Sequence, residues 1–313
     1  MNSRKTYVVP LIVASLLVAS VAVAEEPGAE KAEKPGEKKE EKKEAEGRYP
    51  LAEAERPLTL PKMVLMRELD IDVPRVSLPS PIGGQAAATS FANVSVGASF
   101  GITDDLTVRA QVLPLQLAGG SGFHYGQTSG FYGVDNPGPG VGATYRFLRG
   151  DFEVGGSLDL NLITLSGASG VVITPGVPVR IHVGKSIRID TGAYLPITRA
   201  SIDGSGAFGA PSSIGASGTG LVIPASFLYD ITEPLHVGVA TGFQINDFSD
   251  VGNNTAIPLG IFAGYAIGGK DGPVLDIDPF FNFYELFTPG NVAGATNGGA
   301  YVFGLSVGGF LYL

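Results

Sequence analysis

The chain has 313 residues, which is enough for one large domain or two small ones. Its formal net charge is −9, and the part after the charged N-terminal region stays acidic, which argues against a nucleic-acid partner. Cysteine is absent and the three histidines lie far apart in the sequence. Disulfides are therefore excluded, and we expect neither a metal nor another cofactor.

The first 24 residues have the features of a secretory signal peptide. Arg4 and Lys5 precede the apolar run VVPLIVASLLVASVAV, and Ala22 and Ala24 form an A-x-A cleavage site before Glu25. A retained membrane helix is the alternative, but the run is shorter than the ~20 residues that span a bilayer. We predict that residues 1–24 are a signal peptide and that the mature chain is exported.

Residues 25–48 contain nine acidic and seven basic residues, and no aliphatic side chain larger than alanine. Such a segment cannot bury enough surface to fold alone. We therefore predict a charged, disordered periplasmic tether over residues 25–55 and a folded domain over residues 56–313. A second interpretation is that residues 25–48 contact the cell wall or another partner.

From about residue 62 onward, hydrophobic side chains alternate with a period of two. In the stretch 235–245, the odd positions are Leu, Val, Val, Thr, Phe and Ile, and most even positions are small or polar. A soluble strand has about 5 to 6 residues, whereas a tilted transmembrane strand needs ~9–11. Twelve stretches fit the longer class: 63–73, 91–101, 106–117, 139–147, 152–164, 172–183, 187–197, 219–229, 235–245, 257–268, 274–286 and 300–313.

The connections between these stretches alternate in length. Most of those at one end are long and rich in Gly, Ser, Asn and Pro, and the five at the other end are short. Bacterial outer-membrane barrels combine short periplasmic turns with long outer loops. The pattern predicts an all-β fold: a closed antiparallel up-and-down transmembrane β-barrel of about 12 strands, with 10 or 14 as alternatives, and both termini in the periplasm.

Two of the short connections share a phrase. Residues 100–108 read FGITDDLTV and residues 229–237 read YDITEPLHV. Thr and an acidic residue can hydrogen-bond their own backbone at a bend, and Pro234 fixes φ in the second copy. The repeat therefore indicates one kind of turn used twice.

The C-terminal stretch SVGGFLYL resembles the last strand of the bacterial outer-membrane β-barrel class. In that class, the strand often ends polar-x-Gly-x-x-hydrophobic-x-hydrophobic, and Ser306, Gly308, Leu311 and Leu313 fill these places, with Leu313 where the class usually has Phe. The turn phrase also resembles channel-like barrels of the phenol-degradation MetA-pathway type. The resemblance implies an outer-membrane location in a Gram-negative cell, with lipid and the barrel assembly machinery as partners.

With the large apolar side chains facing lipid, the other face of each strand lines the lumen. Most charged lumen positions fall within about five residues of a short turn, which predicts a charged belt near the periplasmic mouth. Hairpin register pairs Arg146 with Glu153, Arg180 with Asp190, and Asp230 with His236, and leaves Asp276 and Asp278 unpaired. The candidate lumen and selectivity residues are Arg109, Arg146, Glu153, Asp159, Arg180, Arg188, Asp190, Asp230, His236, Asp276 and Asp278.

These features predict a passive pore for ions or small solutes, with a weak cation preference from the unpaired carboxylates. A non-conducting structural barrel that anchors the tether is the alternative. A hydrolase at the rim is a more distant one, because His124 is the histidine in an outer loop and no catalytic signature adjoins it. We therefore do not expect an enzyme.

Overall fold

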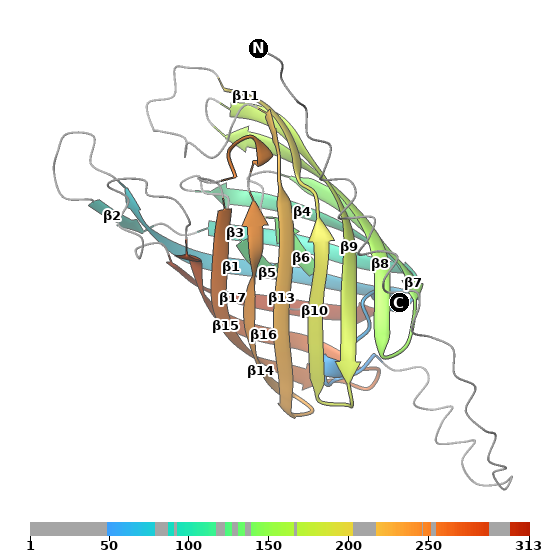
Figure 1. Cartoon of the computed structure of the whole chain (residues 1–313). Coiled ribbons are helices and arrows are strands. Elements are labelled where there is room, and N and C mark those ends of the chain that lie inside the picture. The colour runs from blue at the N-terminus through green and yellow to red at the C-terminus, as the bar shows by residue number, and fades with distance from the viewer. Residues whose placement is uncertain are drawn as a thin grey trace, which may run out of the picture. The chain divides into compact units, whose positions relative to one another are not determined.

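Figure 1 shows the computed structural model of the chain. It describes residues 49–78, 87–90, 93–116, 123–126, 131–134, 139–165, 168–202, 217–245, 247–251, 255–287 and 301–313. These residues belong to one compact unit, Gly47–Leu313. Within them, no helix is long and apolar enough to cross a membrane.

Twelve strands of the described residues form a closed ring. Each pairs antiparallel with the next along the chain, and the last pairs with the first. The predicted up-and-down barrel of about 12 strands is confirmed. The strands are β1 (Val64–Leu78), β3 (Asn93–Thr103), β4 (Leu106–Gln116), β7 (Gly140–Leu148), β8 (Phe152–Leu165), β9 (Ala168–Val183), β10 (Ile187–Tyr194), β13 (Leu221–Thr232), β14 (Leu235–Ile245), β15 (Thr255–Gly268), β16 (Pro273–Phe287) and β17 (Tyr301–Tyr312).

Short strands extend or adjoin this ring. β11 (Ile197–Ile202) continues the path of β10 and pairs with β9, and β12 (Ser217–Thr219) leads into β13. β2 (Ala87–Ser90) pairs with the outer part of β1. β5 (Phe123–Gly126) and β6 (Phe131–Val134) form a separate hairpin that contains His124.

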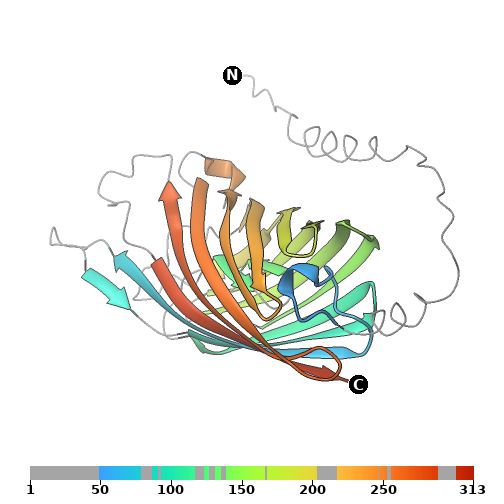
Figure 2. The same cartoon turned by 90° about the horizontal axis from the view of Figure 1, so that it is seen from below.

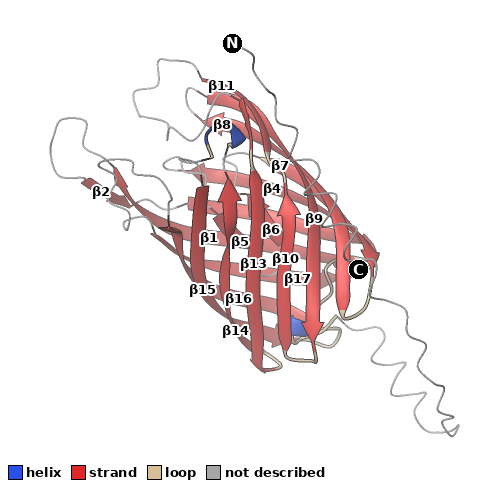
Figure 3. Cartoon of the chain, in the orientation of Figure 1, coloured by secondary structure: helices blue, strands red, loops and turns tan. Residues whose placement is uncertain are grey.

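The two ends of the barrel differ as predicted. At one end the strands are joined by the short connections 104–105, 149–151, 184–186, 233–234 and 269–272. We call this the short-turn end. Figure 3 shows the 3-10 helix η1 (Glu53–Glu55) at this end, and η2 (Phe248–Asp250) at the opposite one. The predicted loop 165–171 is largely strand, because β9 already begins at Ala168.

The exposure of the side chains is the reverse of that in a soluble protein. On β13, Ile223, Phe227 and Tyr229 are 38%, 46% and 44% exposed on the outer face, whereas Ser226 and Asp230 are buried. The same alternation places exposed aromatic residues near the short turns, among them Tyr145, Phe147 and Phe152. A monomeric soluble protein rarely exposes so continuous an apolar surface.

Residues 49–62, which we call the mouth segment, lie inside the short-turn end (Figure 2). The disordered tether is predicted to extend to residue 55, but Glu53 and Ala54 of η1 are buried. The helix stops at Arg56, whose extended conformation (φ −68, ψ 131) is the one favoured before a proline, here Pro57. The folded unit therefore begins before residue 56.

Candidate functional site

The mouth segment packs against two apolar clusters on the inner wall. Ala54 is 1% exposed and lies among Tyr194, Leu228 and Phe262, with Val222, Ala240 and Phe280. Tyr49 and Leu60 pack with residues of β1 and β17, namely Val64, Met66 and Phe310. Met63, at φ 65, then turns the chain into β1. Apolar contacts thus hold both ends of the segment inside the barrel.

A basic subsite on β9 and β10 receives one side of the segment. Arg180 donates to the carbonyl oxygens of Arg56 and Pro57 at 2.9 and 2.7 Å. Arg188 contacts the Glu53 carboxylate at 2.9 Å and also donates to the Glu53 carbonyl. Asp190 joins the two guanidinium groups, at 2.6 Å from Arg180 and 2.9 Å from Arg188.

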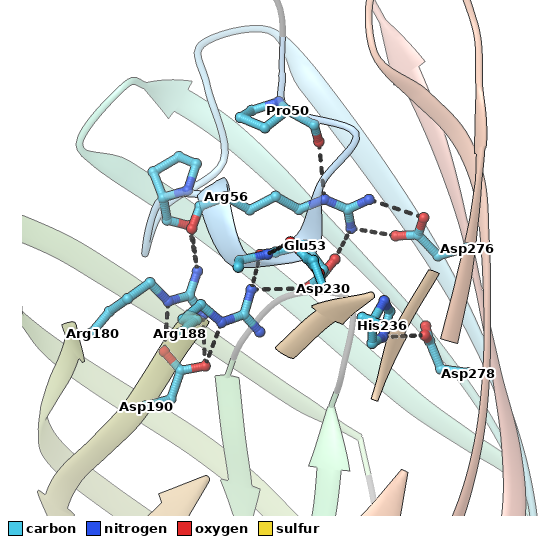
Figure 4. A network of polar contacts seen from close by, with 12 residues as sticks. Pro50, Glu53, Arg56, Arg180, Arg188, Asp190, Asp230, His236, Asp276 and Asp278 are labelled. Carbon is cyan, nitrogen blue, oxygen red and sulfur yellow. Dashed lines mark hydrogen bonds and ion pairs between the residues drawn. The ribbon is translucent and has the colours of Figure 1, made fainter. Parts of the chain in front are cut away.

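An acidic subsite on β16 receives the other side of the segment (Figure 4). Both terminal nitrogens of Arg56 bond to the Asp276 carboxylate, one of them at 3.0 Å, and Arg56 also pairs with Glu53. The guanidinium lies 5.4 Å from the ring centre of Tyr49 and 5.3 Å from that of Phe310. Arg56 and Asp276 are each 1% exposed, so this ion pair is buried.

The backbone of the segment is bound as closely as its side chains. The amide of Ala54 donates to Asp230 Oδ2 at 2.8 Å, and that of Leu58 donates to Glu153 Oε2 at 2.5 Å. The amide of Leu60 donates to Thr107 Oγ1 at 2.8 Å. The two bonds to Asp230 and Glu153 are charge-assisted and therefore stronger than neutral ones. Wall carboxylates therefore hold the segment in one register.

Charge pairing adjusts the ionisation of the segment. Burial raises the pKa of Glu53, but Arg56 and Arg188 outweigh it and hold that pKa below its ordinary value of 4.5. Burial lowers the pKa of Arg56, but Glu53 and Asp276 outweigh it and raise that pKa. Burial raises the pKa of Tyr49 to about 12. Glu53 and Arg56 are therefore both charged at neutral pH in the docked segment.

Two of the three predicted wall pairs make the predicted contact. Arg180 lies opposite Asp190 and bonds to it. Arg146 and Glu153 form an ion pair at 2.6 Å, although the predicted register is wrong, since Arg146 lies opposite Gly155 beyond a bulge. In both cases the two side chains are long enough to meet on the lumen side.

The third pair has different partners from those predicted. Asp230 does lie opposite His236, but it accepts from the Ala54 amide, and His236 Nε2 lies 3.1 Å from Asp278 Oδ1. The expectation that Asp276 and Asp278 are unpaired is wrong. Their partners, Arg56 and His236, lie outside the β15–β16 hairpin. The prediction missed them because it compared each residue only with the facing strand of its own hairpin.

The remaining predicted lumen residues are also paired. Arg109 Nε donates to Asp159 Oδ1 at 2.9 Å. Gly142 lies beneath this pair, and a Cβ there would overlap both side chains. Gly264 lies in the same way beneath Asp278 and His236, and a Cβ there would overlap both side chains. Glycine on the lumen face thus lets charged side chains of neighbouring strands lie flat against the wall.

The residues of the predicted assembly signal lie in and just after β17. Ser306 and Gly308 are buried on the lumen face, whereas Leu311 and Leu313 are 46% and 64% exposed. This alternation agrees with the sequence pattern. Their role in assembly stays a prediction.

Sequence reasoning did not identify Glu53 and Arg56 as site residues. The available signal was a change of composition at residue 48, after which Tyr49, Leu51, Leu58 and Leu60 follow a run without large aliphatic side chains. These apolar residues indicate a segment that can be buried. The contacts of Arg56 with Asp276, 220 residues away, have no signal in the local sequence.

No family model and no curated protein matches the sequence. Among solved structures, the chain is similar to the KdgM porin, with a TM-score of 0.45 and 8% identity over 77% of this chain and 98% of that one. An outer membrane channel from Pseudomonas putida F1 gives a TM-score of 0.46 and 11% identity, covering 90% and 100%. A Pseudomonas aeruginosa FadL homologue gives 0.39 and 10%, covering 79% and 89%. Identities and TM-scores this low do not show the function. We therefore argue the function from the geometry of the chain itself.

Proposed function

We propose that the chain is an outer-membrane pore for ions or small solutes, narrowed at its periplasmic mouth by residues 49–62. The observation that carries the proposal is the reversed exposure of the barrel. Large apolar side chains such as Phe147, Ile261 and Phe303 are 59%, 58% and 52% exposed, while charged residues line the inside. Such a surface suits lipid outside and water or solute inside.

Several further features support the location. A signal peptide is predicted before the barrel, and short turns at one end match the periplasmic side of outer-membrane barrels. On this assignment, residues 25–48 and the end of β17 are periplasmic. The partners are outer-membrane lipid and the barrel assembly machinery, and residues 25–48 could reach the cell wall. The narrower type, a barrel of the phenol-degradation MetA-pathway group, remains a hypothesis.

The charged mouth favours a pore over a structural anchor. Arg188, Asp276 and Glu53 are each at most 3% exposed. Desolvation makes a buried ion pair weak evidence for stability. A barrel that only anchors the chain could seal its lumen with apolar residues at lower cost. Charged groups at the mouth would instead attract or repel charged solutes when the mouth segment is displaced.

Conductance in a planar bilayer tests the proposal. The parent protein should give small or infrequent openings, and a variant that joins Arg48 directly to Met63 should conduct steadily. Heat-modifiable migration in detergent gels verifies that both barrels are folded. If the folded deletion variant does not conduct, the anchor function replaces the pore.

A further inference from the structure

The mouth segment places two opposite charges in two separate subsites of the wall. The Glu53 carboxylate lies against Arg188 on β10, and the Arg56 guanidinium lies against Asp276 on β16 (Figure 4). All four side chains are at most 3% exposed. The basic subsite therefore binds a carboxylate and the acidic subsite binds a cation, and the mouth segment occupies both. From here on we call them the carboxylate subsite and the cation subsite.

The two subsites have different chemistry. The carboxylate subsite offers guanidinium groups, and Asp190 holds Arg188 and Arg180 in place by accepting from both. The cation subsite offers the Asp276 carboxylate beside the ring of Phe310, which is 5.3 Å from the bound guanidinium. A carboxylate with an adjoining aromatic face suits a guanidinium or ammonium group.

The occupying charges are close together. Glu53 and Arg56 are three residues apart and pair with each other as well as with the wall. A ligand that fills both subsites therefore needs its two charges within the span of one small molecule. An amino acid with a basic side chain meets this condition.

From this geometry we infer that the mouth binds a small zwitterion carrying a carboxylate and a cationic group, which displaces residues 49–62 and opens the lumen. This inference rests on the proposed pore. When the segment leaves, Arg180 and Arg188 share the single carboxylate of Asp190, and Asp276 loses Arg56. A solute with one charge replaces only one of the two charges that the segment supplied, Glu53 or Arg56. A zwitterion restores both.

Thiol labelling of Ala54→Cys reports the displacement directly. The chain has no cysteine, and residue 54 is 1% exposed, so the new thiol should react slowly while the segment is docked. L-Arginine is the probe because it carries a guanidinium and a carboxylate. Agmatine lacks the carboxylate and N-acetyl-L-citrulline has no cationic group, so both serve as matched controls at equal ionic strength.

We expect L-arginine to raise the labelling rate about tenfold, which corresponds to a change of ~1.4 kcal/mol in the docking equilibrium. The two controls should leave the rate near its starting value. Equal effects of all three compounds, or no effect of L-arginine, would overturn the inference. Complete labelling before any addition would do so too, because the segment would then not occupy the subsites.

Variants of the wall sharpen the test. Arg188→Gln should abolish the response to L-arginine, and Arg188→Lys, which keeps the charge, should retain part of it and serves where the first variant does not fold. A full response in folded Arg188→Gln would contradict the carboxylate subsite. The pore itself is judged separately, by conductance of the variant without residues 49–62. Failure of that variant to conduct rejects the pore and leaves the labelling result standing.

Discussion

Arg56 and Asp276 are 220 residues apart in the chain and form a two-point ion pair at 1% exposure. One belongs to the segment that enters the barrel, and the other belongs to its wall. The pair therefore joins the mouth segment to the wall of the barrel.

The first prediction concerns this pair. Arg56→Gln and Asp276→Asn should each release the mouth segment, because removing one partner of a buried pair costs about 3–5 kcal/mol. The double variant should be released less than the sum of the two, since it leaves no lone buried charge. Labelling at Ala54→Cys and single-channel conductance measure the release. Strictly additive effects would mean that the two residues act independently.

The second prediction concerns pH. The pKa of Glu53 is lowered in the docked segment, so the docked state binds fewer protons than the released one. Its stability is fully present above the ordinary value of 4.5 and is lost as the pH falls through the lowered value. Conductance should therefore rise as the pH drops below about 4.5.

Glu53→Gln is the control for that prediction, because it removes the titrating group that Arg56 and Arg188 face. This variant should conduct at neutral pH and show a weaker acid dependence. An unchanged acid response would assign the effect to the wall carboxylates instead.

The third prediction concerns Gly264. Asp278 and His236 cross directly over this residue, and a Cβ there would overlap both side chains. Gly264→Ala should separate the pair and lower the melting temperature of the barrel. Gly309, where a Cβ meets no atom within 4 Å, is the matched control. Equal melting temperatures of the two alanine variants would show that the pair tolerates the added group.

The fourth prediction concerns topology. If the short-turn end is periplasmic, a tag inserted at residue 208, in the predicted long loop, should bind antibody on intact cells. A tag at residue 36 should be detected only after the outer membrane is permeabilised. Detection at residue 36 on intact cells would reverse the orientation.

The fifth prediction concerns closure of the barrel. β17 pairs with both β1 and β16, so its loss leaves two unpaired strand edges in lipid. Deleting residues 308–313 should abolish assembly in the membrane, as followed by heat-modifiable gel migration. Leu313→Phe should assemble at least as well as the parent. Normal migration of the deletion variant would argue against the predicted assembly signal.

The strands were predictable because their signal is local. A period of two and the spacing of turns identify all twelve, including β1, whose alternating stretch is flanked by prolines. Register was less predictable at the turns. Bulges after Arg146 and after Asp230 shift the pairing by one residue, and no pattern in the side chains marks them.

The mouth segment was not predictable for a different reason. Leu58, Ala54 and Arg56 bond to residues 95, 176 and 220 positions later in the chain. In the sequence, Glu53 and Arg56 look like a continuation of the charged run at residues 25–48. Sequence reasoning paired the charged wall residues only with one another, and it could not show that Glu53 and Arg56 pair with Arg188 and Asp276.

These long separations set an order of events during folding. The mouth segment leaves the ribosome before any of its wall partners, and its receptors on β8, β13 and β16 form only when the later strands have paired. Contacts of such high contact order form late, because the intervening chain must first be ordered. On the proposed pore function, we therefore expect a newly closed barrel to be open until residues 49–62 dock in its mouth. The rate at which this short segment docks would then set how long the open stage lasts.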